Sequence, residues 1–156
     1  MKVAIVAVGR LRGGPEAALV ADYLARFDRT GRPLGLGPAS LVEVEDRRGG
    51  GPAAEAALIA AAAPKGALLV ALDERGAAPS SPEFAAMLRR WADGGAPGLA
   101  FAIGGADGLD PGLRDRAAAA ISLGRMVWPH LLARVMLAEQ LYRAATILAG
   151  GPYHRA

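Results

Sequence analysis

Short apolar runs of β-forming residues alternate with alanine-rich helical stretches along the whole chain, and this alternation limits the possible folds most strongly. Several runs are apolar at almost every position, as expected for strands that are covered on both faces. The pattern predicts an α/β fold, a parallel sheet with helices on both faces, in a single domain spanning residues 1–156. The expected strands are residues 3–8, 40–45, 67–72, 99–103 and 123–128. The expected helices are residues 16–28, 52–63, 81–91, 110–120 and 130–148.

Local signals at the helix ends support these boundaries. Ser81 is expected to cap the helix in which Pro82 occupies the first position, because a serine hydroxyl accepts a bond from a free backbone N–H group. Asp110 is expected to cap the following helix in the same way. The Gly-Gly-Pro sequence at residues 150–152 ends the last helix, since neither residue type continues a helix well.

The composition excludes several classes of protein. None of the 156 residues is cysteine, which excludes a disulfide scaffold, a cysteine-based zinc site, an iron–sulfur cluster and a cysteine nucleophile. With only two histidines as well, we expect no metal site, although Asp and Glu side chains could in principle complete one. The apolar runs end well before the roughly 18 residues that a membrane span requires, and the first residues lack a signal-peptide pattern. We therefore expect a cytoplasmic protein with no membrane partner.

Charge is distributed unevenly along the chain. Residues 1–111 have a net charge of −1, whereas residues 112–156 have a net charge of +4. A basic last third permits a nucleic-acid or phosphate partner, although charge alone favours ordinary solvated helix faces. The glycine-rich loops at residues 31–37 and 47–51 are flanked by arginine, which is compatible with contact to RNA phosphates or with ordinary solvent exposure.

Ligands of open parallel sheets bind beyond the carboxyl ends of the strands, where residues 72–76, 104–108 and 123–129 are expected. The Rossmann fingerprint is absent after the first strand, because Leu11 stands where the second glycine is required. No P-loop motif is present either, so a dinucleotide dehydrogenase or a P-loop NTPase is disfavoured. The glycines of residues 104–108 still allow the backbone to approach a ligand closely, or simply form a tight turn.

Two histidines are available for acid–base chemistry. His130 begins the last helix directly after Pro129, and we expect it to pack or to cap that helix. His154 lies between Tyr153 and Arg155 close to the end of the chain. An aromatic ring that stacks on a base, a titratable imidazole and a phosphate-binding guanidinium together suit RNA chemistry, with a frayed terminus as the alternative.

The last expected helix is partly amphipathic. Its apolar stripe is typical of a core or a dimer interface. Glu139 and Arg143 are four residues apart on this helix, so they are expected to form an ion pair on its surface.

Seven motifs occur in order along the chain and resemble one known family. The motifs are Leu72-Asp73-Glu74-x-Gly76, Ser80-Ser81-x-Glu83-Phe84-Ala85, Ile103-Gly104-Gly105-x-x-Gly108, Ser122-Leu123-x-x-Met126-x-x-Pro129-His130, Arg134, Glu139-Gln140-x-Tyr142-Arg143-Ala144 and Tyr153-His154-Arg155. Together they resemble the RlmH family of SPOUT methyltransferases, which methylate N3 of a pseudouridine in 23S ribosomal RNA. The resemblance covers the whole chain and is strongest from Leu72 onward.

The resemblance implies properties that the alternation of strands and helices does not. They are a C-terminal trefoil knot, S-adenosylmethionine as cofactor, an obligate homodimer, and 23S rRNA within the ribosome as partner. Ordinary rules of chain topology would predict an unknotted sheet. The implied cofactor-binding residues are Leu72, Gly104, Leu123, Gly124, Arg125, Met126, Val127 and Trp128. The implied catalytic residues are His154, Arg143 and Tyr153, and the implied RNA-binding residues are Tyr142, Arg143 and Arg155.

The implied chemistry requires a base, because N3 of pseudouridine carries a weakly acidic proton that must leave as the methyl group arrives. His154 is the candidate base, and an arginine would stabilise the developing negative charge. Three residues depart from the family pattern, Gly124, Val127 and Leu131, which stand where serine, threonine and glutamine are common. Methylation of another RNA nucleotide, a ribosome-binding module without catalysis, and an α/β domain that binds another nucleotide remain as alternatives.

Overall fold

A five-stranded parallel sheet forms the centre of the computed structural model, which describes residues 1–155. Its strands lie in the order β2-β1-β4-β3-β5, and every neighbouring pair is parallel. The strands are β1 (Lys2–Val8), β2 (Ala39–Val44), β3 (Leu68–Ala77), β4 (Gly98–Ile103) and β5 (Ala119–Ile121). The helices are α1 (Pro15–Gly31), the 3-10 turn η1 (Arg32–Leu34), α2 (Gly51–Ala62), α3 (Ser81–Asp93), α4 (Pro111–Arg116) and α5 (His130–Leu148).

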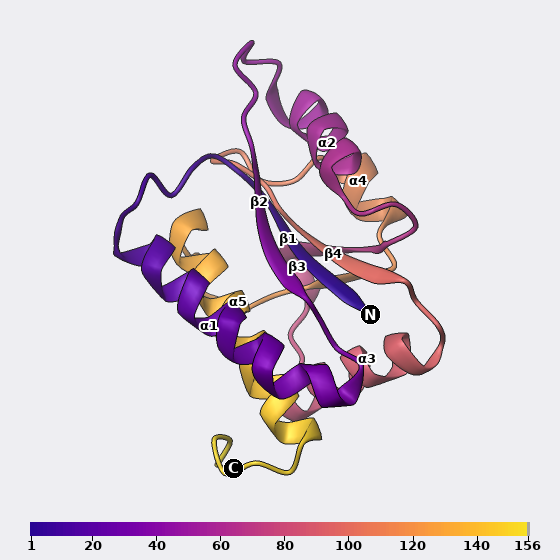
Figure 1. Ribbon diagram of the computed structural model, residues 1–156. Helices are drawn as coiled ribbons and strands as arrows, with labels where there is room; N and C mark the ends of the chain where they lie inside the picture. Colours follow the sequence, from indigo (N-terminus) through magenta and orange to yellow (C-terminus); the bar gives the residue numbers. More distant parts are fainter. Residues whose placement is uncertain (156) are drawn as a thin grey trace.

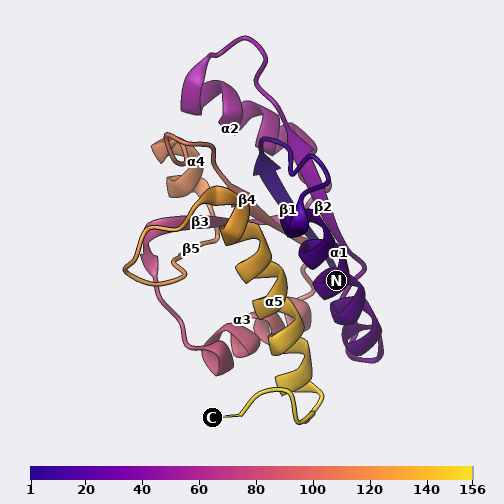
Figure 2. The same ribbon diagram turned by 90° about the vertical axis from the view of Figure 1, so that its left-hand side faces the viewer.

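The helices cover both faces of the sheet, as the alternation predicts. Figure 1 shows α1 and α5 on one side and α2 and α4 on the other, and Figure 2 shows α3 beside α5. The two faces are filled differently along β4, where Leu99, Phe101 and Ile103 point into the larger core under α1, α3 and α5. Ala100 and Ala102 point toward α2 and α4. Small residues on that face allow those helices to pack closely against the sheet.

The region before α5 differs from the sequence-based expectation. Residues 117–120 were expected to end a helix, but α4 stops at Arg116 and β5 begins at Ala119, because these residues pair with β3. The strong helix propensity of alanine is overridden here by strand pairing. Residues 123–128 were expected as a strand, and that prediction is wrong. They form an irregular loop in which Met126 is 72% and Val127 83% exposed.

The start of α3 also differs by one residue. Ser80, rather than Ser81, caps the helix. A capping box needs an acid three residues after the cap, and Glu83 stands at that distance from Ser80. The Ser80 backbone N–H donates to Glu83 Oε2 at 2.7 Å, while the Ser81 hydroxyl donates instead to Gln140 Oε1 on α5 at 2.8 Å. Ser81 therefore ties α3 to α5.

Candidate functional site

A pocket of about 500 Å³ lies at the carboxyl edge of the sheet, bounded by the segments that follow β3, β4 and β5. These are the three segments in which a ligand site was expected. Seven of the eight implied cofactor-binding residues line the pocket, and Arg125 does not. The seven are Leu72, Gly104, Leu123, Gly124, Met126, Val127 and Trp128. Residues from three separate parts of the chain thus meet in one place, which we call the donor pocket.

Two glycines shape the donor pocket for physical reasons. A Cβ atom on Gly104 would lie 2.6 Å from the backbone carbon and oxygen of Gly108, so no larger residue fits without moving that turn. Gly124 has a φ of +118°, a conformation that residues with side chains rarely adopt. The Ser122 hydroxyl donates to the Gly124 carbonyl at 2.8 Å and accepts from its N–H at 3.2 Å, which fixes the start of the loop.

Carboxylates outnumber cationic side chains among the residues that line the donor pocket. The lining includes three carboxylates, those of Asp73, Glu74 and Asp107, and one arginine, Arg75. The Asp73 side chain is only 12% exposed, accepts the Arg75 backbone N–H at 2.8 Å, and lies 3.9 Å from Arg114. Leu72, Leu123 and Trp128 supply apolar walls. The pocket therefore suits a ligand that combines an apolar ring system with positive charge.

A second cluster, which we call the tail cluster, forms where the last residues fold back on the second half of α5. Glu139 is its centre: its Oε1 accepts from Arg143 Nη2 at 2.6 Å and from the Tyr153 hydroxyl at 3.0 Å. Arg143 Nη1 lies 3.5 Å from His154 Nδ1, and its guanidinium lies 4.8 Å from the centre of the Tyr153 ring. The structure thus brings the three implied catalytic residues together.

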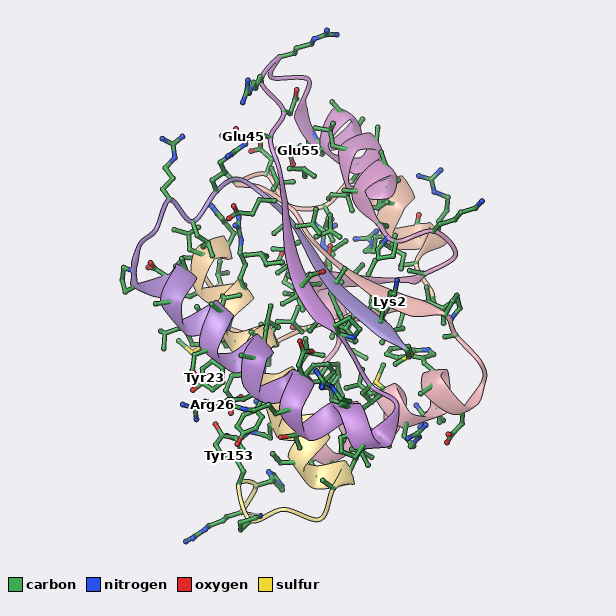
Figure 3. All side chains as sticks on the ribbon, in the orientation of Figure 1. Lys2, Tyr23, Arg26, Glu45, Glu55 and Tyr153 are labelled. Carbon is green, nitrogen blue, oxygen red and sulfur yellow. The ribbon has the colours of Figure 1, made fainter. Side chains whose placement is uncertain are left out.

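The remaining residues of the tail cluster come from α1 and α5. The Tyr142 and Tyr153 rings lie 4.5 Å apart, and Tyr23 of α1 packs 6.3 Å from Tyr142. Figure 3 shows Tyr153 next to Tyr23 and Arg26 at the lower end of the molecule. Tyr142 is half-buried in this packing, whereas Arg155 is exposed. Of the three implied RNA-binding residues, Arg155 is therefore the most exposed.

Burial and hydrogen bonding change the acidity of two groups in the tail cluster. Burial, followed by the hydrogen bond to Glu139, raises the pKa of Tyr153 to about 12. The hydrogen bond to Glu139 also raises the pKa of Arg143, which is a cation at any physiological pH. Tyr153 is therefore a neutral hydrogen-bond donor and a poor base. Among the three implied catalytic residues, His154 alone offers a ring nitrogen that can accept a proton.

The donor pocket and the tail cluster meet different stretches of α5, the pocket its first turn and the cluster the helix from Glu139, at its middle, onward. His130 lines the donor pocket, and Arg143 follows it by thirteen residues, which is about 20 Å along a helix axis. A second pocket of about 590 Å³ separates them, bounded by α3, α5 and residues 121–124. It shares Ser122, Leu123 and Gly124 with the donor pocket and reaches Glu139. Within one chain, the implied base does not reach the donor pocket.

Two residues have larger roles than their sequence pattern indicated. The expected ion pair of Glu139 with Arg143 is confirmed, but the Glu139 side chain is only 16% exposed and also holds Tyr153. Arg134 is fully buried and donates to the carbonyl oxygens of Val8 and Gly9 and to Glu43. Arg134 shares its face of α5 with the buried Leu137, Ala138 and Leu141, and an arginine at such a helical spacing was the available signal for a buried anchor. Burial lowers the pKa of Arg134, which Glu43 partly opposes.

The described part of the chain has neither a cluster of metal-ligating side chains nor a membrane-spanning helix. Among residues 1–155, no group of three or more His, Cys, Asp or Glu side chains is placed to hold a metal ion. Within the same residues, no helix has the length and apolar character needed to cross a bilayer.

Comparison with known proteins decides the family. The family model described as "Predicted SPOUT methyltransferase" matches residues 1–154. The chain belongs to this family. It is 70% identical over 155 residues to a protein of Cereibacter sphaeroides and 68% identical to one of Dinoroseobacter shibae, covering 99% of each chain. A protein of Paracoccus denitrificans is 68% identical over the same length. All three are named "Ribosomal RNA large subunit methyltransferase H".

A solved structure supports the fold independently. The crystal structure of a probable methyltransferase from Bordetella pertussis Tohama I has a TM-score of 0.54 to this SPOUT methyltransferase. The match covers 92% of this chain and 96% of the other, at 17% sequence identity. At that identity the likeness shows the shared α/β fold alone.

Proposed function

We propose that this SPOUT methyltransferase transfers a methyl group from S-adenosylmethionine to N3 of a pseudouridine in 23S rRNA of the assembled ribosome. The observation that carries the proposal is the 68–70% identity over 99% of both chains to relatives named for methylation of large-subunit ribosomal RNA. The gathering of the implied cofactor-binding residues around one pocket supports it. Ribosomes work in the cytoplasm, so the same proposal locates the chain there.

The donor pocket fits S-adenosylmethionine in its chemistry. The ligand combines an adenine ring with a positively charged sulfonium, and the pocket combines apolar walls with an excess of carboxylates. When bound, this cofactor supplies an electrophilic methyl group. Gly104 and the loop at residues 123–128 would hold it mainly through backbone groups, which glycine allows to come close. Such backbone contacts tolerate the departures at Gly124 and Val127.

The tail cluster supplies the proton chemistry in this proposal. His154 accepts the N3 proton of the target base, and the Arg143 guanidinium stabilises the negative charge that develops on the ring. Tyr153 positions these groups, because its hydroxyl and Arg143 share the carboxylate of Glu139. Tyr142 and Arg155 contribute stacking and phosphate contacts to the RNA. A nucleotide in an RNA loop is already unpaired, which lowers the cost of extruding it.

We propose further that the enzyme works as a homodimer in which one chain's tail cluster completes the donor pocket of the other. The separation of about 20 Å along α5 supports a shared site, because one chain alone leaves the base far from the donor. Exposed apolar side chains beside the pocket support an interface there: Met126, Val127, Trp128 and Leu132. The C-terminal trefoil knot implied by the family is part of the same proposal.

Mass spectrometry of 23S rRNA tests the function directly. Ribosomes from cells lacking this chain are incubated with the purified protein and isotopically labelled S-adenosylmethionine. We expect one labelled methyl group on N3 of a pseudouridine, and no labelled methyl group would contradict the proposal. In the His154→Ala variant we expect transfer to fall at least a hundredfold, while calorimetry shows donor binding unchanged. A normal rate in that variant would show that His154 is not the base.

A further inference from the structure

Four arginine side chains outside both sites gather at the loops that follow β1 and β2. Arg10 and Arg12 belong to the first loop, and Arg47 and Arg48 belong to the second. The side chains of Arg10, Arg12 and Arg47 are 55%, 81% and 79% exposed, and Arg48 is exposed as well. Although 35 or more residues separate the two pairs in sequence, the Gly9 N–H donates to the Val44 carbonyl at 2.8 Å and holds the loops together. We call these four side chains the arginine surface.

Local acids neutralise only part of this charge. Three of the arginines share one carboxylate, that of Glu45, at 3.2 Å from Arg10, 3.9 Å from Arg12 and 3.8 Å from Arg47. The other nearby acid, Asp46, accepts the backbone N–H groups of Arg48 and Gly50. Four guanidinium groups thus share two nearby carboxylates, and the arginine side chains remain largely open to solvent. Pairs this exposed are weak and exchange readily for a stronger anion.

Hydrogen bonds with buried and half-buried side chains fix the backbone of the first of these two loops. The buried Arg134 binds the Val8 and Gly9 carbonyls at the start of the first loop. Leu11 is buried, and its backbone N–H donates to Glu43 Oε1 at 2.7 Å. Arg12, with a φ of 51°, has the left-handed conformation that ordinary residues seldom adopt. These anchors order the loop backbone before any partner arrives, which reduces the entropy lost on binding.

The arginine surface lies at the same edge of the sheet as the donor pocket. Both follow the carboxyl ends of parallel strands, and α2, which comes after the second loop, touches the pocket through Glu55 and the Gly105 N–H at 3.4 Å. Pro52 of α2 lines the donor pocket as well. Figure 3 shows Glu45 and Glu55 close together at the upper end, with Tyr153 at the opposite end.

We propose that the arginine surface binds the phosphate backbone of the ribosomal RNA around the target nucleotide, on the side of the donor pocket. Guanidinium groups recognise phosphate oxygens in pairs, and phosphate contacts orient a protein on RNA without reading its bases. Four arginines on two adjacent loops match a run of successive phosphates. The inference rests on the proposed RNA substrate, and it adds a second contact region, separate from the tail cluster, to the same reaction.

A set of charge-matched variants tests the proposal by binding to large ribosomal subunits from cells lacking the chain. One protein carries Arg10→Gln, Arg12→Gln, Arg47→Gln and Arg48→Gln. The control carries Arg29→Gln, Arg32→Gln, Lys65→Gln and Arg90→Gln, four exposed cations that precede strands and so lie at the opposite edge of the sheet. We expect the first protein to bind at least tenfold more weakly, and the control to stay within about twofold of wild type.

The salt dependence of that binding identifies the partner as phosphate. Each phosphate that a variant no longer binds should reduce the slope of log affinity against log salt by roughly 0.7–0.9. We expect a reduction of about 2–4 in the first protein and little change in the control. If binding weakens equally in the two proteins, the effect comes from net charge alone and the proposal is overturned. An unchanged salt slope in the first protein would also overturn it.

Crosslinking separates RNA from protein as the partner. The chain has no cysteine, so Arg12→Cys creates a unique attachment point for a benzophenone label. We expect labelled protein to crosslink to 23S rRNA, whereas crosslinking only to a ribosomal protein would overturn the proposal. The Arg32→Cys control should crosslink poorly.

Donor binding by calorimetry should be unchanged in all variants. If the wild-type chain fails to transfer a methyl group, the proposed function is rejected. The binding and crosslinking results would still decide separately whether the arginine surface contacts RNA.

Discussion

At the scale of single residues, Glu139 determines where the end of the chain lies. One of its oxygens accepts from both Arg143 and Tyr153, and the other accepts from Gln140 at 2.8 Å. An i, i+4 pair on a solvated helix contributes little stability. Glu139 differs because it is mostly buried and joins residues fourteen positions apart. It therefore acts as a tether for the tail and not only as one half of a surface pair.

The pKa of the Tyr153 hydroxyl, which can be measured by absorbance, reports on this tether. Its pKa is raised from 10.0 to about 12, chiefly by burial and then by Glu139. The folded state thus favours the neutral phenol, so the stabilisation is complete below pH 10 and is lost as the pH rises through about 12. Absorbance at 295 nm should show a tyrosinate step near pH 12 that disappears in Tyr153→Phe and moves to lower pH in Glu139→Gln. Tyr142→Phe should keep the step, and a step that survives in Tyr153→Phe would contradict the assignment.

The positions of individual arginines show which part of the charge pattern is free to meet a partner. The basic last third of the chain permits a nucleic-acid or phosphate partner, but half of its six arginines are engaged internally. Arg134 is buried, Arg143 is paired with Glu139, and Arg114 lies near Asp73 and Asp115. The arginine surface comes instead from the part of the chain whose net charge is near zero. Charge summed along a sequence does not report which charges meet in space.

At the scale of secondary structure, β5 decides the shape of the donor pocket. Only three residues long, it pairs with β3 and leads directly into residues 122–124. Its alanines predicted a helix, since alanine is the strongest helix former. Pairing to β3 prevails, and it depends on Gly76, where a Cβ atom would lie 2.6 Å from the backbone of Ala120. No periodicity in the sequence reports such a contact between two backbones.

The Gly76→Ala substitution should therefore disturb both stability and donor binding. The added methyl group must displace β5, and overpacking of this kind costs about 1–3 kcal/mol of the free energy of unfolding. We expect lower stability in urea unfolding and at least tenfold weaker binding of S-adenosylmethionine by calorimetry. The Gly151→Ala control makes the same change where the nearest atom, the Thr146 oxygen, is 3.5 Å away. Wild-type donor binding by Gly76→Ala would show that β5 does not position residues 122–124.

At the scale of the whole molecule, two separate stretches of α5 carry the two halves of the proposed site. The donor pocket meets the first turn of α5, and the tail cluster contacts the helix from Glu139, at its middle, to Arg143. A rigid helix keeps these two stretches apart, and the proposed shared site between two copies would account for the separation. In a symmetric dimer each chain would give its tail to the other and receive one in return.

Mixing two inactive variants tests this arrangement. Gly104→Ala damages the donor pocket, because its Cβ would lie 2.6 Å from the Gly108 backbone, and His154→Ala removes the proposed base. After the two proteins are unfolded and refolded together, half of the dimers contain one copy of each. One of their two shared sites is then intact, so methyl transfer should recover to about one quarter of wild type. Each variant refolded alone should stay inactive, and a mixture with no recovered activity would indicate that each site is built within one chain.

Local chemistry along the chain was sufficient to predict the parallel α/β architecture, the start of α5 at His130 and its end at Leu148, and the three segments that form the donor pocket. These features follow from side-chain periodicity and from glycine and proline at fixed positions, which act over a few residues. The motifs were also sufficient to indicate the SPOUT family, which the family match confirms. Residues after parallel strands meet at one edge of any such sheet, so the pocket follows from the fold class.

The tertiary structure alone decided the features that depend on distant partners. The end of α4 and the start of β5, the burial of Arg134 and the arginine surface all result from contacts between residues far apart in sequence. Strand pairing and buried hydrogen bonds of this kind outweigh local propensity even though they must close long loops, and local sequence does not report their partners. The separation of the implied base from the donor pocket belongs to the same class, because only the folded chain sets His154 beside Arg143, about thirteen residues along α5 from the pocket.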